Sequence, residues 1–326
     1  LAARYVELVE VLDVDLVRLD FVRRALAAEC ELTCLSRRRP AEEWQHYAAA
    51  DLFDAEAVGA ACRGQDVVVH LAGVPGLGRA APADLLHANV VGTAAVLEAA
   101  VAAGVPRLVL ASSGAAGGFS FQQRPLQPRY LPLDEDHPCE PDDEYGLSKL
   151  LAELTCARYQ RRFGITTICL RINHNWCVDR AGAEVAVRSG WAARAALTVE
   201  QLWGDRYRKV VEDPHGEGDW PTPGPPSPPQ LLWAVTDIRD AAEAVRLALS
   251  ADVAGHHVLH INGADTCSTV PTPDLIDRHH PRAEMRAELD GHASLISSAR
   301  AADVIGYHPT RSWRDSEFAT WLGAQA

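Results

Sequence analysis

A tyrosine and a lysine four residues apart are the side chains of this sequence best suited to proton transfer. Tyr145 and Lys149 lie in a segment of helical character, 144–163, which places both on one face, one turn apart. A free phenol has a pKa of about 10 and is a poor base near neutral pH. An ammonium group beside it stabilises the phenolate and lowers that pKa. The pair is therefore predicted to be an acid–base centre, although the spacing alone also occurs on solvated helix faces.

Ser113 is the third candidate, because it directly follows a predicted strand, 107–112. It precedes Tyr145 by 32 residues (145 − 113). In a doubly wound sheet, ligands lie beyond the carboxyl ends of the strands. We therefore expect the Ser113 hydroxyl to hold a substrate oxygen while Tyr145 gives or takes its proton.

The elements that must position these groups follow an alternation of short apolar runs and longer amphipathic segments. Near-continuous apolar strands separated by helices indicate a parallel sheet covered on both faces. The sequence thus predicts an α/β fold, a Rossmann-type doubly wound parallel sheet with a smaller C-terminal substrate-binding lobe. The predicted strands are 31–35, 66–71, 107–112, 166–172 and 258–261, and the predicted helices are 85–103 and 144–163.

Two units are predicted from the same pattern. Segment 213–229 is rich in Pro, Gly and charged residues without periodicity, which indicates a long surface loop. Strand-like sequence resumes at Leu231, and small helices and turns are expected after residue 261. The predicted units are a dinucleotide-binding domain, 1–172 plus 235–262, and a substrate-binding lobe, 173–234 plus 263–326.

Composition limits the partners of the chain. The 326 residues carry a formal net charge of −13, whereas a nucleic-acid partner requires a basic face. The eight cysteines show no CxxC pair and no Cys/His zinc spacing, so we expect no metal site, buried reduced thiols and a cytoplasmic protein. We find no apolar stretch of roughly 18–20 residues and no leader-like start, and we expect neither a membrane partner nor a signal peptide.

Short motifs surround the three candidate residues. They are Asp51-Leu52, His70-Leu71-Ala72-Gly73, Asn89-Val90-Val91-Gly92-Thr93, Leu110-Ala111-Ser112-Ser113, Pro132-Leu133-Asp134-Glu135-Asp136, Tyr145-Gly146-Leu147-Ser148-Lys149, Leu170-Arg171-Ile172-Asn173 and 235–244. With them, the chain from about residue 22 to the C-terminus resembles the extended short-chain dehydrogenases/reductases, the NAD(P)-dependent epimerase/dehydratase family. The resemblance implies that Ser113 polarises the substrate oxygen, Tyr145 is the acid/base, and Lys149 holds the cofactor ribose.

The resemblance also implies which residues bind the cofactor and the substrate. Ser112 is expected beside the nicotinamide, and Asn173 and His174 at the substrate. A hydrogen-bonded loop histidine is an equal alternative for His174. The implied cofactor-binding residues are Ser36, Arg37, Arg38, Asp51, Leu52, Leu71, Ala72, Gly73, Asn89, Ser112, Tyr145 and Lys149.

Two further polar residues have structural alternatives. For Asn89, two roles are equally expected: support of the helix geometry and a proton relay. Asp240 is expected to cap or brace the helix that follows it rather than to act in catalysis.

The choice of cofactor depends on the end of the strand 31–35. An acidic residue there accepts hydrogen bonds from the adenosine ribose and favours NAD. Here the strand runs into Ser36, Arg37 and Arg38, and a hydroxyl with guanidinium groups suits a 2′-phosphate. We therefore expect NADP(H) in preference to NAD(H). The alternative is that Arg37, Arg38 and Arg39 form a solvated turn.

The N-terminal segment departs from the family pattern. A glycine-rich turn should precede the strand 31–35 by about 15–20 residues. Alignment with the family places Leu12, Asp15 and Arg18 at the three glycine positions, and no glycine occurs before Gly59. Segment 11–19 reads equally well as one continuous helix. Whether a dinucleotide is bound stays open at this point.

The favoured function is NADP-dependent oxidation–reduction or epimerisation of a hydroxyl or carbonyl substrate, namely a sugar, sugar acid or nucleotide sugar. One alternative is a degenerate member without dinucleotide binding that carries out a redox-neutral cyclisation or elimination. A second alternative is a non-catalytic binding protein. The resemblance further implies a homodimer through the helices at 85–103 and 144–163.

Overall fold

The computed structural model describes residues 3–8, 26, 30–37, 39, 44–122, 126–176, 231–268, 270–312 and 314. Within them, seven parallel strands form one sheet in the order β10-β7-β5-β4-β1-β2-β3. Chain order reverses between β1 and β4, and such a switch point is where doubly wound folds bind their ligands. This confirms the predicted fold class. The strands are β1 (Ala3–Leu8), β2 (Cys30–Ser36), β3 (His46–Ala49), β4 (Val67–His70), β5 (Arg107–Ser113), β7 (Thr166–Ile172) and β10 (His256–Ile261).

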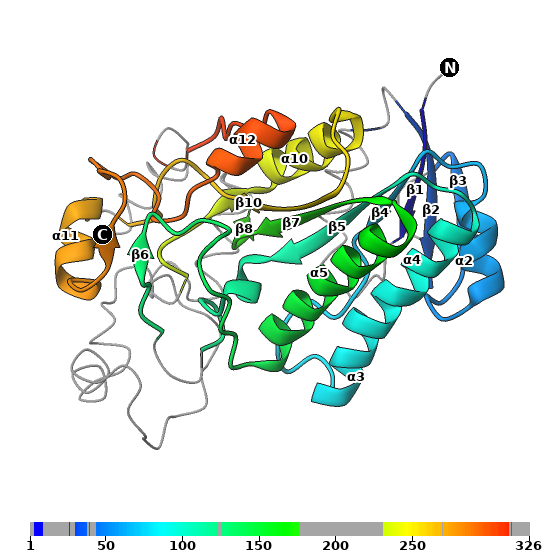
Figure 1. Cartoon of the computed structure of the whole chain (residues 1–326), viewed down its shortest axis with the longest axis horizontal. Helices are drawn as coiled ribbons and strands as arrows, with labels where there is room; N and C mark the ends of the chain where they lie inside the picture. Colours follow the sequence, from blue (N-terminus) through cyan, green and yellow to red (C-terminus); the bar gives the residue numbers. More distant parts are fainter. Residues whose placement is uncertain are drawn as a thin grey trace.

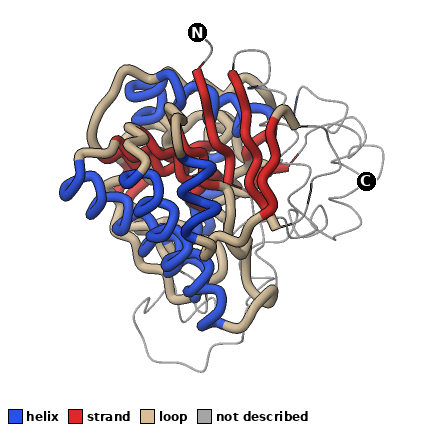
Figure 2. Tube along the Cα trace, turned by 90° about the vertical axis from the view of Figure 1, so that its right-hand side faces the viewer, coloured by secondary structure: helices blue, strands red, loops and turns tan. Residues whose placement is uncertain are grey.

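Helices cover both faces of this sheet (Figure 1, Figure 2). One layer contains α2, α4 and α5, whose apolar side chains pack with Val68, Leu108 and Cys169 of the sheet. The other contains α10 and α12, which pack on Val109, Ile168 and Leu259. Strands that are apolar on both faces require this arrangement. The bounds are α2 (Ala55–Cys62), α3 (Pro82–Leu86), η1 (His87–Val91), α4 (Gly92–Ala102), η2 (Gly114–Gly117), α5 (Glu144–Phe163), α10 (Ile238–Ser250), α11 (Thr272–His279) and α12 (Ala299–Ile305).

Helix α5 begins and ends where its sequence dictates. Asp143 is the N-cap, and its Oδ1 accepts a hydrogen bond from the Gly146 N–H at 2.7 Å. Gly164 closes the helix with a left-handed φ of 77°, which glycine adopts without strain. The bounds fall at the predicted residues, 144 and 163.

The continuous helical segment Pro82–Ala102 corrects one expectation. It has 21 residues, and an 18-residue window in it has a mean hydropathy of 1.5, so by length and composition it is apolar enough to span a membrane. Its inner side chains, among them Leu85, Val96 and Leu97, are fully buried. The segment packs against α2 and α5 in the helical layer of the fold, as a core helix does.

A third apolar cluster lies away from the main sheet, around Leu131, Leu133 and Trp233. Two short parallel ladders accompany it, β6 (Tyr130–Leu131) with β11 (Glu284–Met285) and β8 (Asn175–Trp176) with β9 (Thr236–Asp237). The expectation of a strand from Leu231 was wrong. Residues 231–233 form a turn, and only Thr236–Asp237 is extended. The predicted loop 213–229 lies outside the described residues.

Candidate active site

Tyr145 and Lys149 lie on the first turns of α5, at the carboxyl ends of the central strands. The Lys149 Nζ lies 5.7 Å from the centre of the Tyr145 ring and donates a hydrogen bond to the Ala111 carbonyl at 3.0 Å. Lys149 is 8% exposed, so its ammonium acts in a partly dehydrated environment. There a charge acts more strongly on a neighbouring phenol than it does in water.

Ser113 ends β5 and lies where α5 approaches the strand. Its Oγ accepts a hydrogen bond from the Ala115 N–H at 3.2 Å and so caps η2. Gly146, next to Tyr145, packs so closely on η2 that a Cβ would lie 2.5 Å from the Ala115 carbonyl oxygen. The contact brings Ser113 and Tyr145 to the same end of the sheet.

Ser112 points away from Ser113, as alternate residues of a strand do. Its Oγ donates a hydrogen bond at 2.6 Å to Glu153, two turns after Tyr145 on α5. Glu153 also pairs with Arg171 of β7, and all three side chains are buried. The predicted position of Ser112 beside the nicotinamide stays a prediction, but its hydroxyl is directed to Glu153.

Asn89 is a clamp between three segments. Its Oδ1 accepts a hydrogen bond from the Val74 N–H at 2.6 Å, and its Nδ2 donates to the Val74 carbonyl and to Ser148 Oγ. It occupies a π-helical turn, a feature frequent at functional sites. Of its two open roles, the geometry favours support.

His70 at the end of β4 is fully buried beside this clamp. The Thr93 hydroxyl donates to the Asn89 carbonyl at 2.7 Å, so it accepts from His70 Nε2 at 3.0 Å. Burial, followed by the charge of Lys149, lowers the His70 pKa to about 3. His70 is therefore neutral, and Nε2 carries its hydrogen.

Four of the predicted cofactor residues lie at the ends of β2 and β3. Arg37 NH1 lies 3.9 Å from Asp51 Oδ2, and both side chains are 47% exposed. Ser36 and Leu52 are buried, with Leu52 directly under Gly92. Arg38 and the aligned positions Leu12, Asp15 and Arg18 lie outside the described residues.

The loop after β4 carries Leu71, Ala72 and Gly73. Gly73 has a φ of 148°, and a Cβ there would lie 2.6 Å from Asn89 Oδ1. The glycine therefore lets Asn89 pack against this loop. Among the described residues, Arg37 at the end of β2 fits a nicotinamide dinucleotide, since its guanidinium is half-exposed where this fold binds adenosine.

Asn173, predicted to contact substrate, is 5% exposed and donates to Asn262 Oδ1 at 2.9 Å. It also packs on Gly114, where a Cβ would lie 1.9 Å from its Oδ1. His174 follows it, half-buried, and its carbonyl accepts from the Thr236 N–H. Neither contact points to substrate, and both roles stay predictions.

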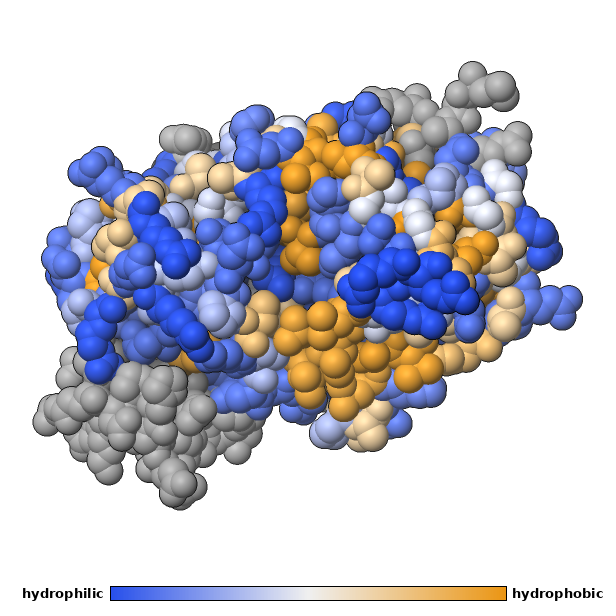
Figure 3. Space-filling view, in the orientation of Figure 1, coloured by the Kyte–Doolittle hydropathy of each residue, from blue (hydrophilic) through white to orange (hydrophobic). Residues whose placement is uncertain are grey.

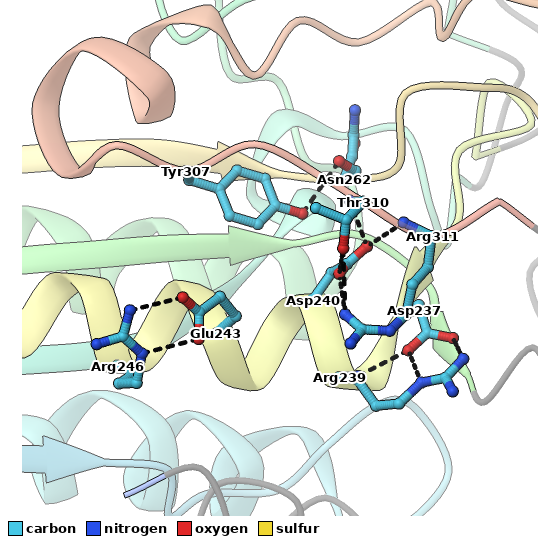
Figure 4. Close-up of polar contacts among 9 residues, drawn as sticks. All are labelled: Asp237, Arg239, Asp240, Glu243, Arg246, Asn262, Tyr307, Thr310 and Arg311. Atoms are coloured by element: carbon cyan, nitrogen blue, oxygen red, sulfur yellow. Dashed lines mark hydrogen bonds and ion pairs between the residues drawn. The ribbon is translucent and has the colours of Figure 1, made fainter. Parts of the chain in front are cut away.

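Asp240 braces the C-terminal segment to α10, as Figure 4 shows. Its carboxylate accepts hydrogen bonds from the backbone N–H groups of Thr310 and Arg311, both at 3.1 Å. The Thr310 hydroxyl and the Arg311 guanidinium also donate hydrogen bonds to this carboxylate. Asp237, not Asp240, caps α10. The bracing role is confirmed, and the capping role is not.

Phe121 is a residue of the site that sequence reasoning missed. Its ring meets the Tyr145 ring edge-on, with centroids 5.5 Å apart and an interplanar angle of 89°. Its Cζ would lie 3.6 Å from a Cβ on Gly76, in the loop after β4. Phe121 thus adds an apolar wall next to the reactive phenol. Only its position, a few residues after a strand-end serine, signals this in the sequence.

Comparison with known proteins completes the description of the site. The model of the NAD dependent epimerase/dehydratase family matches residues 20–207. The chain is 28% identical to the UDP-glucose 4-epimerase of Corynebacterium glutamicum over 255 residues, 76% of this chain and 72% of that protein. It is 38% identical to the uronate dehydrogenase of Agrobacterium fabrum over 123 residues, 37% of this chain and 43% of that protein.

A solved structure shares the fold. It is a short-chain dehydrogenase/reductase superfamily protein from Agrobacterium tumefaciens with bound NAD. The TM-score is 0.65 at 21% identity, over 99% of this chain and 97% of the other. At that identity the likeness concerns the fold alone.

Proposed function

The chain belongs to the NAD-dependent epimerase/dehydratase family, and from this premise we propose that it oxidises, reduces or epimerises a carbinol carbon of a sugar, sugar acid or nucleotide sugar. The family consists of epimerases and dehydrogenases, so the chain is an enzyme of that type. The observation that carries the proposal is the grouping of Tyr145, Lys149 and Ser113 at one end of the sheet.

Each of the three residues has a defined part in this mechanism. Ser113 holds the reacting oxygen by its hydroxyl, and Tyr145 takes the proton from that oxygen or returns it. Lys149 stabilises the phenolate and, in this proposal, also holds the cofactor ribose. Phe121 keeps water from one side of the phenol. A bound nicotinamide supplies or accepts the hydride at its C4 atom.

We propose NADP(H) as the preferred cofactor. Arg37 provides a guanidinium at the end of β2, where the adenosine ribose lies in this fold. Asp51, 3.9 Å away, orients it without enclosing it, since both side chains are half-exposed. Asp51 and Leu52 follow β3 on the neighbouring strand, beside the end of β2. The family relationship supports a nicotinamide dinucleotide, and Arg37 supports the phosphorylated form.

The test is Tyr145→Phe, which removes only the hydroxyl. A screen of sugars with both dinucleotides first identifies those that the wild type turns over. On these sugars the variant's turnover should be lower than the wild type's by roughly 100-fold or more, the usual scale for a general acid or base. Folding should survive, because Tyr145 is only half-buried and the ring remains.

Tyr47→Phe is the matched control, since Tyr47 donates its hydroxyl to the Ser36 carbonyl far from the chemistry. It should leave the chemical step within a few-fold. Equal turnover by wild type and Tyr145→Phe would remove Tyr145 from the mechanism.

We also propose a homodimer through α4 and α5. Leu147 and Leu154 on α5 are 38% and 55% exposed, and Val91 before α4 is 47% exposed. Figure 3 shows an apolar patch where these helices lie side by side. Exposed apolar patches of this kind mark interfaces. A Leu147→Glu/Leu154→Glu variant should sediment as a monomer, and a wild type that sediments as a monomer would contradict the dimer.

The division into a dinucleotide-binding domain, 1–172 plus 235–262, and a substrate-binding lobe is likewise a proposal. The separate apolar cluster around Trp233 supports it. A cytoplasmic location is proposed on the seven described cysteines, which are all free thiols.

A further inference from the structure

Behind the reaction centre, α5 carries a buried ion pair that the proposed mechanism does not use. Glu153 lies two turns after Tyr145 and one turn after Lys149, on the same helix face. Arg171 of β7 donates to it twice, from Nε to Oε1 at 2.9 Å and from NH2 to Oε2 at 2.8 Å. The side chains of Glu153 and Arg171 are 4% and 5% exposed. This bidentate geometry fixes both groups.

The pair is tied to the strand that ends in Ser113. Ser112 and Arg171 are register partners on the neighbouring strands β5 and β7. Ser112 donates its hydroxyl to Glu153, and Lys149 donates to the carbonyl of Ala111. The inner face of α5 therefore holds two successive residues at the end of β5.

Three titratable groups near Glu153 are neutral near pH 7. Burial raises the pKa of the thiols Cys139 and Cys169, and it lowers the pKa of His256. Burial by itself would lower the pKa of Arg171, but the hydrogen bonds and charge of Glu153 outweigh it and keep Arg171 charged. Glu135, a second carboxyl whose pKa is raised by burial, also interacts with Arg171 and lies 3.6 Å from Arg300 as its own cation. The Glu153–Arg171 pair is thus one anion and one cation beside a second such pair.

Around Tyr145, the facing groups come from three elements. Lys149 lies on α5 itself, and its charge also acts on the neutral His70 of β4. Phe121 comes from the loop after η2, and Asp143 lies at the N-cap of α5. A charge change two turns along α5 would therefore act on the same phenol that Lys149 acts on.

We propose that the Glu153–Arg171 pair is a charge balance for the reaction centre: it leaves the inner face of α5 with the single net charge of Lys149, and so lets Lys149 set the proton affinity of Tyr145. Glu153 and Arg171 are positioning residues, since they act on Tyr145 through their charge and touch no reacting atom. The proposal rests on the proposed function only for the role of Tyr145.

Two opposite single substitutions test the charge balance. Glu153→Gln leaves Arg171 uncompensated, which favours the Tyr145 phenolate and should lower the pH midpoint of its titration. Arg171→Met leaves Glu153 uncompensated and should raise it. Eight helical residues span about 12 Å, and with an effective dielectric near 20 each shift should be about one pH unit. The double variant restores neutrality and should titrate as the wild type does.

The measurement is the pH titration of the Tyr145 ring-carbon NMR signal in tyrosine-labelled protein, assigned by its absence in Tyr145→Phe. Ser112→Ala is the matched control, since it breaks the tie to β5 without changing charge, and its midpoint should equal that of the wild type. Opposite shifts that cancel in the double variant support the proposal. Shifts of one sign, no shift, or an equal shift in Ser112→Ala overturn it.

Folding outcomes are also decisive. A buried ion pair replaced by uncharged groups of similar volume is usually tolerated, so the double variant should fold. If one single variant fails to fold, the other still shows the predicted direction. If only the double variant folds, the pair serves folding and the proposal is overturned. The titration needs neither substrate nor cofactor, so it fails or succeeds independently of the turnover test on Tyr145→Phe.

Discussion

At the scale of single residues, the proposed preference for NADP(H) depends on the facing pair of Arg37 and Asp51. The guanidinium and carboxylate are 3.9 Å apart and each half-exposed, so neither is fully occupied by the other. A weak, solvated ion pair yields readily to a stronger partner. A 2′-phosphate is such a partner, because it carries more charge and more acceptor oxygens than a carboxylate.

Arg37→Ala should therefore weaken NADP(H) binding much more than NAD(H) binding. A charge-assisted contact of this kind contributes about 1.5–3 kcal/mol, or about one to two decades of affinity. Calorimetric titration of both dinucleotides measures the difference. Arg39→Ala is the control, since Arg39 lies over the Tyr47 ring and is expected to leave both affinities unchanged. Equal losses of NADP(H) and NAD(H) in Arg37→Ala would assign Arg37 to structure.

Sequence patterns predicted that Tyr145, Lys149 and Ser113 lie together, because their positions on one helix and at one strand end follow from local patterns. They did not identify Glu153, Arg171 or Phe121 as parts of the site. A glutamate on an amphipathic helix is usually solvated, and only the pairing of β5 with β7 buries Glu153 against Arg171. Phe121 reaches Tyr145 through the path of a loop, which no periodicity encodes.

At the scale of elements, the docking of α5 on η2 sets the distance between the acid–base pair and Ser113. Gly146 makes this docking possible, because a Cβ there would meet the Ala115 carbonyl at 2.5 Å and Pro141 Cβ at 2.8 Å. Both neighbours are held by the backbone and cannot swing aside. Gly59 in α2 offers a matched comparison, since nothing lies within 4 Å of its added Cβ.

Gly146→Ala should destabilise the protein by about 1–3 kcal/mol, the usual range for overpacking, and should lower turnover because α5 must shift away from η2. Gly59→Ala should stabilise it by roughly 0.5–1 kcal/mol, since alanine loses less entropy in a helix. Urea unfolding measures both free energies of unfolding. Stability changes of the same sign in the two variants would contradict the close packing at Gly146.

The elements with strong local patterns were predicted closely. β7 and α5 fall at the predicted residues, and β2, β4 and β5 within one or two residues. β1 and β3 were missed, because Arg4 and Glu7 interrupt the apolar residues of Ala3–Leu8 and His46–Ala49 is a short run with two alanines. Both are strands because β2 lies between them and supplies hydrogen bonds on both edges. That pairing is a long-range property.

At the scale of the whole molecule, the residues proposed to bind the dinucleotide are combined with an N-terminal segment that lacks glycine. No glycine precedes Gly59, and Leu12 and Asp15 align with glycine positions of the family. A carboxylate at about 5 Å from a pyrophosphate, with an effective dielectric near 20, is unfavourable by roughly 3 kcal/mol. That corresponds to about two decades of affinity.

The chain should therefore bind NADPH and NADH weakly compared with a relative that has the glycine turn. Calorimetry on nucleotide-free protein measures this directly. Asp15→Gly should strengthen binding of both dinucleotides, whereas Asp13→Gly, off the aligned positions, should not. A dissociation constant in roughly the low micromolar range or below for the wild type would contradict the expectation.

Buried histidines give the molecule a pH-dependent stability. Burial lowers the pKa of His70 and His280 to about 3 and of His279 to about 4. Unfolded histidine titrates near 6.5, so below that pH the unfolded chain binds protons that the folded chain does not. Stability should be full above about pH 6.5 and fall towards pH 4, by about 1.4 kcal/mol per pH unit for each histidine.

Asp143 opposes this trend in part. Burial raises its pKa to about 6, so its contribution to stability is lost as pH rises from about 4 to 6. Urea unfolding between pH 7 and 4 measures the sum, and His280→Gln should reduce the slope by about one histidine's share. His46→Gln, on the surface, is the control. A slope that is the same in wild type and His280→Gln would show that His280 does not remain neutral in the fold.

The all-parallel sheet has a consequence for the order in which this protein assembles. No pair of neighbouring strands in it is joined by a hairpin; β5 meets β7 only after the chain from Ser113 to Thr166 has closed into a loop. Such non-local closures slow folding, whereas helices form within microseconds. During refolding, the helical signal should therefore return before the burial of Glu153 against Arg171. The proposed reaction centre would be among the last parts of the molecule to form. Folding intermediates in which β5 has not yet paired with β7 would expose the edge of β5.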